Sequence, residues 1–294
     1  MTPIPSIHRG PRTPLRTAGS ALKEALGALL LWLLWQFPVY AFLQMPPRLA
    51  IVWLCGVAAF FLWCYAARAG WGSARRRATS RVRPVPAPAW RWIAVLAPVM
   101  STAALSMWVV LSALGIAGHR TLPQQILDYA DQPGGTLVLV LLLAGMAPLL
   151  EEFAFRGWLQ RPLERRYGPA RAIVVTALVF AVAHMSPGGI PIYAAGGAAL
   201  GYVAWTTRSI WASVALHVAW NSGVLLFGGF FPGFDPAAHG PALALPGALA
   251  FAACAAVFAW VAPRLRAAGH AANGERSWHD VVRTPEGPGV RREG

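Results

Sequence analysis

The chain has 294 residues, of which 56% are hydrophobic and only 12% charged, whereas soluble domains of ordinary composition carry about 25% charged residues. This composition excludes an ordinary water-soluble enzyme. The formal net charge of +14 raises the question of nucleic acid. However, no RNA- or DNA-binding motif is present and the arginines flank apolar blocks, so we expect contact with anionic lipid headgroups and none with nucleic acid.

The apolar blocks predict an all-α, polytopic membrane protein, an eight-transmembrane-helix bundle with an intramembrane polar site. Blocks of about 20 residues match the ~30 Å hydrocarbon core of a bilayer when they form helices. A basic N-terminal region, residues 1–23, precedes the first block, which is too long for a signal peptide and is expected to stay uncleaved. The predicted spans are 24–45, 49–67, 91–117, 136–159, 170–186, 190–206, 209–230 and 243–263.

The distribution of basic residues predicts the orientation of this 24–263 membrane domain. If loops alternate sides, 23 of the 25 Lys and Arg residues fall on one side and only Arg48 and Arg120 on the other. Positive loops stay in the cytoplasm, so both termini are expected there. Residues 264–294 are rich in Gly, Arg and Pro and predict a disordered cytoplasmic tail.

Small residues inside the spans have simple structural interpretations. Cys55, Cys64 and Cys254 lie in apolar runs without metal-ligand spacing, so we expect buried cysteines without chemistry. Gly197 and Gly201 stand four residues apart in the sixth predicted span. This small-xxx-small pattern predicts close helix packing.

Polar side chains interrupt the apolar blocks in the second half of the chain. Glu151 and Glu152 lie in the fourth predicted span, His184 in the fifth, and His217 and Asn221 in the seventh. An ionisable group at bilayer depth costs about 2.5 to 3.5 kcal/mol on insertion scales, so these groups must face protein or water. Counted from the arginines at the predicted cytoplasmic edge, they lie about 14 to 20 Å deep. We therefore expect one buried site built from three helices near the midplane.

The spacing within each motif indicates chemical roles. Glu152 and Arg156 are four residues apart, so the guanidinium can neutralise that carboxylate. Glu151 is rotated about 100° from Glu152 on the helix and is left for chemistry. His217 and Asn221 are also four residues apart and form a donor pair suited to an oxyanion. A carboxylate with a histidine can act as general base for a water molecule.

Structural interpretations of the same residues stay open at this point. Glu152 and Arg156 can be a buried ion pair that only holds helices together, and a lone membrane histidine can be an interhelical hydrogen-bond donor. Glu151 with His184 and His217 can also ligate zinc and leave a position for water. The site is chemically complete without a metal, so zinc is permitted and not required.

Three motifs resemble, in order, those of the CAAX protease and bacteriocin-processing family, abbreviated CPBP and also called Abi proteins. They are Glu151-Glu152-x-x-x-Arg156, Phe180-x-x-x-His184 and His217-x-x-x-Asn221. The match covers about residues 136–225. The resemblance implies an eight-helix intramembrane bundle. The family is customarily labelled a metalloprotease family. Its eukaryotic branch removes the last three residues of prenylated C-a-a-X proteins.

The resemblance also implies residue roles. Residues matching Glu151 and His184 activate water, and those matching His217 and Asn221 stabilise the oxyanion. Glu152 and Arg156 complete the first motif. The first 130 residues carry no motif of the family, so the resemblance says little about them.

The leading hypothesis is an intramembrane endopeptidase that hydrolyses a peptide bond of a membrane-associated, CAAX-like protein or peptide. An alternative is a non-proteolytic membrane scaffold or bacteriocin-immunity factor that uses the polar cluster only for binding. An ion transporter is disfavoured because no inverted repeat is visible. The Arg-rich, Lys-poor composition indicates a bacterial origin, hence a bacterial cell membrane.

Overall fold

The computed structural model describes residues 44–69, 80–118 and 124–272, together with the isolated positions Lys23, Leu26, Gly27 and Leu30. Every regular element in this part of the chain is helical. Most of the first predicted span, 24–45, and residues 273–294 lie outside the described residues. The all-α prediction is therefore confirmed where the structure describes the chain.

The described residues contain ten α-helices and five 3₁₀-helical or π-helical segments. The α-helices are α2 (Pro47–Ala69), α4 (Trp90–Ala113), α5 (Gln124–Ala130), α6 (Gly135–Leu139), α7 (Ala147–Glu152), α8 (Gln160–Tyr167), α9 (Pro169–Ala183), α10 (Ile190–Thr207), α11 (Ile210–Phe230) and α12 (Ala244–Ala272). The 3₁₀ segments are η1 (Ala87–Ala89), η4 (Pro187–Gly189) and η5 (Pro236–Leu243), and the π-helical segments are η2 (Val140–Met146) and η3 (Phe153–Leu159).

Four helical stretches among the described residues are long and apolar enough to cross a membrane. They are Ala87–Ala113, Gly135–Tyr167, Ile210–Phe230 and Pro236–Gly269. They correspond to the third, fourth, seventh and eighth predicted spans. The fifth corresponds to α9, whose 15 residues extend only about 22 Å, less than the ~30 Å hydrocarbon core. The count of eight transmembrane helices thus stays a prediction.

The fourth predicted span is a continuous helical rod that carries both glutamates. It runs through α6, η2, α7, η3 and α8, so π-helical turns flank α7 on both sides. Pro148 lies in the first turn of α7 and has no N–H to donate, which removes one α-helical hydrogen bond at this point. Such π turns often occur at functional sites. Here they change the directions in which side chains project from the rod before and after Glu151 and Glu152.

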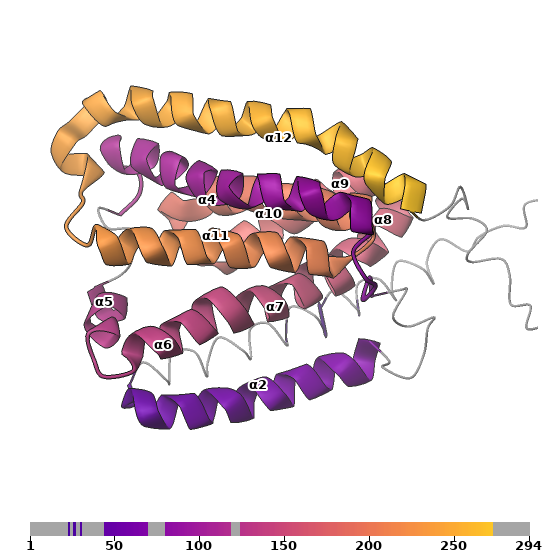
Figure 1. The fold of residues 1–294 in the computed structure, drawn as a ribbon, viewed down its shortest axis with the longest axis horizontal. Helices are drawn as coiled ribbons and strands as arrows, with labels where there is room; N and C mark the ends of the chain where they lie inside the picture. The colour runs from indigo at the N-terminus through magenta and orange to yellow at the C-terminus, as the bar shows by residue number, and fades with distance from the viewer. Residues whose placement is uncertain are drawn as a thin grey trace, which may run out of the picture.

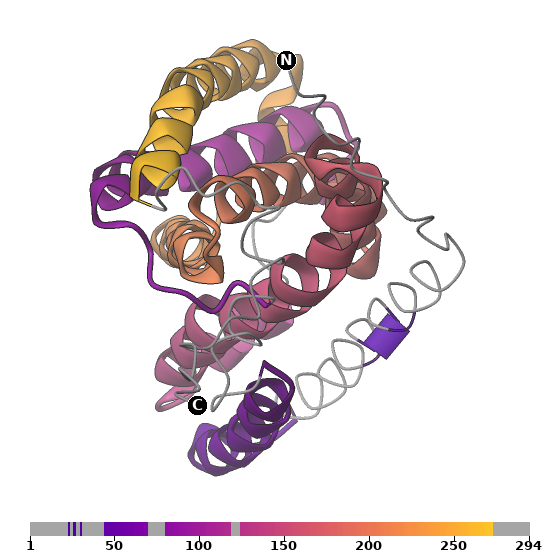
Figure 2. The ribbon, with the colours of Figure 1, turned by 90° about the vertical axis from the view of Figure 1, so that its right-hand side faces the viewer.

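Two apolar clusters hold the bundle around this rod. One joins α4, α10, α11 and α12, and the other joins the rod to α2, α9 and the start of α11. Figure 1 shows α12, α4, α11, α7 and α2 arranged side by side, with α10 and α9 behind them. In Figure 2, α2 lies at the periphery, and its main contact with the other described helices is with α6.

The outer surface of the bundle is apolar, as a lipid environment requires. Large hydrophobic side chains are exposed along α9 at Val174, Leu178 and Val182, and along α12 at Leu249 and Trp260. A water-soluble monomer rarely exposes such a continuous apolar surface. These side chains are suited to contact with lipid tails.

Two sequence predictions need correction here. Cys254 is buried, but Cys55 is exposed on α2, because this helix has few contacts with the other described helices. The tail predicted to be disordered from residue 264 is helical as far as Ala272. Leu265 and Ala268 continue the apolar face of α12 and are buried in the bundle, which explains why the helix extends past the predicted end of the span.

Candidate functional site

The two adjacent glutamates occupy the end of α7 and are both buried, Glu151 with 7% of its surface exposed and Glu152 with none. Glu152 Oε1 accepts a hydrogen bond from Arg156 Nη1 at 2.8 Å. The same oxygen contacts His217 Nδ1 on α11 at 2.9 Å. Glu152 thus joins a guanidinium from its own rod to an imidazole from another helix, and the predicted Glu152–Arg156 pair is present.

Contacts at Nδ1 determine how both imidazoles face the site. His184 Nδ1 lies 2.7 Å from the carbonyl oxygen of Phe180, which can only accept, so Nδ1 carries the proton. His217 Nδ1 faces the ion-paired Glu152 carboxylate and likewise donates. In a neutral imidazole the other nitrogen is then an acceptor. Both histidines therefore present Nε2 as a lone pair, or as an N–H when the ring is protonated.

Both Nε2 atoms point at the second glutamate. Glu151 Oε2 is 3.9 Å from His184 Nε2 and 3.8 Å from His217 Nε2. These separations exceed the range of a direct hydrogen bond, and Glu151 Oε2 has no hydrogen-bond partner among the described residues although it is buried. A water molecule between the three atoms would bridge them. The structure thus brings Glu151, His184 and His217 to one point.

His184 reaches this point from the end of a helix, which differs from the sequence prediction of a continuous span over 170–186. Helix α9 ends at Ala183, and Met185 adopts a positive φ of 50°. Pro187 then begins η4 and cannot donate a backbone hydrogen bond to continue the helix. The imidazole is consequently less enclosed than its partners, with a side-chain exposure of 20% against 3% for His217.

Asn221 belongs to the same helix as His217 but has a partner of its own. Its Nδ2 donates to the carbonyl oxygen of Leu143 at 2.7 Å, in the π-helical segment η2. A carboxamide has two N–H groups, so one remains for another acceptor. In the predicted donor pair of His217 and Asn221, one N–H of Asn221 is therefore used for contact between helices.

Aromatic rings surround the meeting point, and sequence reasoning missed two of them. Phe180, His184, Tyr193, Trp220 and His217 form a closed ring of neighbours with centroid separations between 4.0 and 6.4 Å. Tyr193 stacks on His184 with planes 18° apart. Tyr193 and Trp220 lie in apolar helices without a motif, so no sequence signal distinguished them from packing residues.

A ladder of polar side chains continues along the rod beyond Arg156. Glu152, Arg156, Gln160 and Glu164 are four residues apart in turn. Arg156 Nη2 donates to the carbonyl oxygen of Gly197 at 3.0 Å, and Gln160 Nε2 donates to that of Gly201 at 2.9 Å. The two glycines were predicted to allow close packing, and they admit these side chains to the backbone of α10. The four-residue period was the signal for Gln160 in the sequence.

The donor types at the meeting point are those of a His₂Glu zinc site, and each Nδ1 has the supporting contact that such ligands usually have. The spacing does not fit, however. Ligands at ~2.0 to 2.1 Å around a tetrahedral ion are roughly 3.3 Å apart, less than the 3.8 and 3.9 Å observed. No group of three metal-ligating side chains meets metal-site geometry within 44–69, 80–118 and 124–272. The steps proposed below use side chains only.

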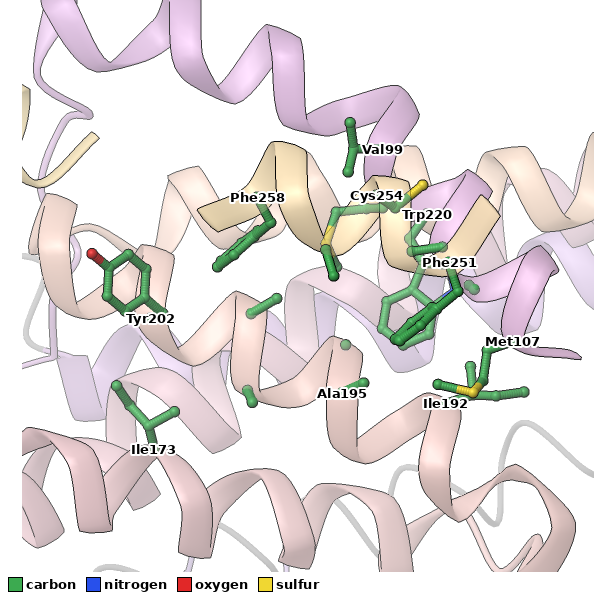
Figure 3. A pocket seen from close by; sticks show the side chains of 17 residues that line it. Val99, Met107, Ile173, Ile192, Ala195, Tyr202, Trp220, Phe251, Cys254 and Phe258 are labelled. Atoms are coloured by element: carbon green, nitrogen blue, oxygen red, sulfur yellow. The ribbon is translucent and has the colours of Figure 1, made fainter. Parts of the chain in front are cut away.

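An apolar cavity of about 400 Å³ adjoins the site between α4, α10, α11 and α12. Figure 3 shows its length, from Tyr202 and Ile173 at one end to Met107 and Ile192 at the other. Trp220 lines the cavity and also neighbours His217, with ring centroids 5.5 Å apart. The indole packs over Gly196, where an added Cβ would lie 2.2 Å from it. Trp220 thus forms a wall shared by the cavity and the polar site.

Comparison with known proteins gives one match. Residues 133–223 match a family model described as Type II CAAX prenyl endopeptidase Rce1-like, and this segment holds all six polar residues of the three motifs. No curated protein and no solved structure matches the chain. The match confirms the family resemblance of this segment. The matched family consists of CAAX proteases, which are hydrolases. Together with the apolar helices, the match indicates an integral membrane protein.

Proposed function

We propose that this protein is an intramembrane endopeptidase that cleaves a peptide bond of a membrane-associated protein or peptide. The observation that carries the proposal is the convergence of Glu151 Oε2 with the Nε2 atoms of His184 and His217 inside a buried, aromatic-walled site. Bacterial origin, a cell-membrane location and cytoplasmic termini belong to the same proposal.

In the first step, Glu151 accepts a proton from the water while His184 orients that water through Nε2. The resulting hydroxide attacks the carbonyl carbon of the scissile bond, and the carbonyl oxygen becomes the oxyanion of a tetrahedral intermediate. His217 donates to the oxyanion when Nε2 is protonated, because Glu152, 2.9 Å from Nδ1, stabilises the imidazolium. The second N–H of Asn221 adds a further donor.

In the second step, the C–N bond breaks and the leaving amine takes the proton held by Glu151. The carboxylate then returns to its starting state, and the two peptide products leave. Nothing is consumed except water. Burial supports both steps, because a site with little water strengthens charge stabilisation of the oxyanion.

The substrate is proposed to carry a hydrocarbon group, as in a lipid-modified CAAX-like protein. The cavity beside Trp220 is lined mainly by aliphatic, aromatic and sulfur side chains, and its volume lies within the usual range for ligand pockets. A hydrocarbon chain held in this cavity would be separated from His217 only by the indole of Trp220. This would place a neighbouring peptide bond near the water-activating groups.

The decisive variant is Glu151→Gln. Loss of the carboxylate removes the proton acceptor while the shape of the side chain stays the same, so we expect turnover to fall by at least ~100-fold, the scale of general-base catalysis. The readout compares peptide termini in native membranes carrying the intact protein or the variant, which requires no prior choice of substrate.

Asp131→Asn serves as a control, because Asp131 is an exposed carboxylate in the loop before α6. We expect this variant to leave the pattern of termini unchanged. Termini that persist in membranes carrying folded Glu151→Gln protein would refute the hydrolytic role. Binding of a partner that survives the same substitution would support a scaffold instead.

A further inference from the structure

A second charged cluster lies at the far end of the rod, away from Glu151 and Glu152. We define the arginine cluster as five arginines, drawn from three parts of the chain, that are linked to one another by electrostatic interactions. They are Arg81 and Arg83 before η1, Arg161 and Arg165 in α8, and Arg208 between α10 and α11. Arg161 is ten residues beyond Glu151, or about 15 Å along a helix, so the cluster is separate from the catalytic site.

The carboxylate of Glu164 leaves part of the Arg81 guanidinium without an acceptor among the described residues. Its Oε1 accepts from Gln160 Nε2 at 2.8 Å, and its Oε2 is ion-paired with Arg81 Nη2 and with Arg161 Nη1, the latter at 3.6 Å. Arg81 is only 1% exposed. Within the described part of the chain, its Nε and Nη1 atoms have no hydrogen-bond partner. A buried guanidinium with two unused N–H-bearing nitrogens is costly unless an acceptor is supplied.

The backbone holds the arginines in place. Arg81 and Arg208 have φ values of 59° and 55°, which non-glycine residues seldom adopt. The carbonyl oxygen of Arg81 accepts from the N–H of Ile210 at 3.0 Å, and that of Arg83 accepts from Ser209 Oγ at 2.6 Å. The segment before η1 is thus attached to the turn between α10 and α11. This attachment brings the backbones of Arg81, Arg83 and Arg208 close to one another.

Because these arginines lie close together, positive charge is disfavoured at the partly exposed edge of the cluster, formed by Arg83 and Arg208. Burial lowers the pKa of Arg208 from its ordinary value, and the neighbouring charges of Arg83 and Arg81 lower it further. Arg83 and Arg208 are half-buried, so the cluster reaches the protein surface on their side. An anion bound there would compensate the positive charges and would accept hydrogen bonds from the guanidinium groups.

We propose that the arginine cluster binds a phosphate group, either in the headgroup of an anionic phospholipid or as free inorganic phosphate. Guanidinium groups match phosphate oxygens in fork geometry and form strong charge-assisted hydrogen bonds with them. The cluster lies where the apolar stretch Gly135–Tyr167 ends, which is the depth of lipid headgroups. The proposal does not depend on the catalytic role of Glu151.

The first experiment uses the full chain, purified in an uncharged detergent and freed of lipid. Native mass spectrometry measures retention of dioleoylphosphatidylglycerol against dioleoylphosphatidylcholine, and thermal unfolding measures the effect of sodium phosphate against sodium chloride at equal ionic strength. Selective retention of phosphatidylglycerol identifies the lipid as the source. If sodium phosphate raises the Tm more than sodium chloride does and phosphatidylglycerol is not selectively retained, the ligand is free inorganic phosphate. Failure of both probes overturns the proposal.

Variants distinguish the cluster from general surface charge. Arg161→Gln and Arg208→Gln each remove one charge, and we expect each to weaken binding of the effective probe about tenfold, as the loss of one charge-assisted contact implies. Arg166→Gln is the matched control, because Arg166 is exposed on the same helix and packs on Tyr167. Equal weakening by Arg166→Gln overturns the proposal.

Glu164→Gln separates a binding site from a purely structural latch. This change breaks the ion pairs but removes the competing negative charge, so we expect the folded variant to bind the probe more tightly. If the cluster served only to attach α8 to the segment before η1, Glu164→Gln would lower the Tm and would not tighten binding of the probe. Weakened binding by folded Glu164→Gln protein therefore counts against the proposal. Gel filtration and unfolding without added anion show whether each variant is folded.

Discussion

At the scale of single residues, the most informative feature is that two neighbouring glutamates have opposite surroundings. Glu152 accepts from Arg156 and His217 and is fully buried. Glu151 Oε2 is buried without a hydrogen bond among the described residues and faces two imidazole nitrogens. One carboxylate therefore holds partners in position, and the other is available for proton transfer.

This contrast predicts different effects for the same substitution at the two positions. Glu152→Gln leaves the Arg156 guanidinium buried without its anion, and breaking a buried pair in this way costs about 3 to 5 kcal/mol. We expect a low yield of folded protein and a lower Tm. Glu151→Gln should keep a Tm close to that of the natural sequence. Equal Tm values for the two variants would contradict the division of roles.

The groups around Glu151 lie farther apart than zinc ligands do, and this spacing predicts the response to metal removal. Because the proposed steps use only side chains, we expect turnover to persist after exhaustive chelation, with no stoichiometric metal in elemental analysis of the purified protein. Activity that is lost on chelation and restored specifically by zinc would show that the three groups close around an ion during the reaction.

At the scale of elements, the rod Gly135–Tyr167 and helix α10 are joined by side-chain to backbone hydrogen bonds. Arg156 and Gln160 reach the carbonyl oxygens of Gly197 and Gly201, which is possible because neither glycine has a Cβ. Arg156 in turn holds Glu152, which orients His217. The position of α10 is therefore transmitted to the site through one chain of contacts.

Gly201→Ala tests this contact between elements. The added Cβ would lie 2.8 Å from Gln160 Oε1, so the amide must move and its hydrogen bond to α10 weakens. Overpacking of this kind costs about 1 to 3 kcal/mol, and we expect a lower Tm. Gly229→Ala in α11 is the control, because nothing lies within 4 Å of its added Cβ. Ala has a higher helix propensity than Gly, so Gly229→Ala should keep or raise the Tm. A similar loss of Tm in both variants would contradict the role assigned to the contact at Gly201.

At the scale of the whole molecule, the chain is an apolar bundle in which two clusters of charged groups lie at two different levels. The catalytic candidates lie within the helices, and the arginine cluster lies at the end of the rod. An exposed apolar surface surrounds the first level, while the second joins five arginines with Glu164. This separation is what a membrane protein requires, because charges are tolerated at the headgroup level and must be compensated deeper.

The asymmetry of charge predicts the topology. Fluorescent protein fused after Gly294 should fold and fluoresce, as expected for a cytoplasmic terminus, and alkaline phosphatase inserted at residues 119–123 should be active outside the cytoplasm. The physical reason is that basic loops are retained on the cytoplasmic side. The reverse pattern of reporter activity would contradict the predicted orientation and the span count on which it depends.

The sequence by itself determined the membrane class, the order of the motifs and the Glu152–Arg156 pair, because composition and spacing within one helix act locally. It also predicted close packing at Gly197 and Gly201. Only the tertiary structure decided that His184 and His217 meet at Glu151, that Asn221 is partly engaged by Leu143, and that Tyr193 and Trp220 enclose the site. Such contacts depend on how far each helix is rotated and where it ends. Pro148, Met185 and Pro187 alter both through π turns and a helix terminus that no periodic pattern records.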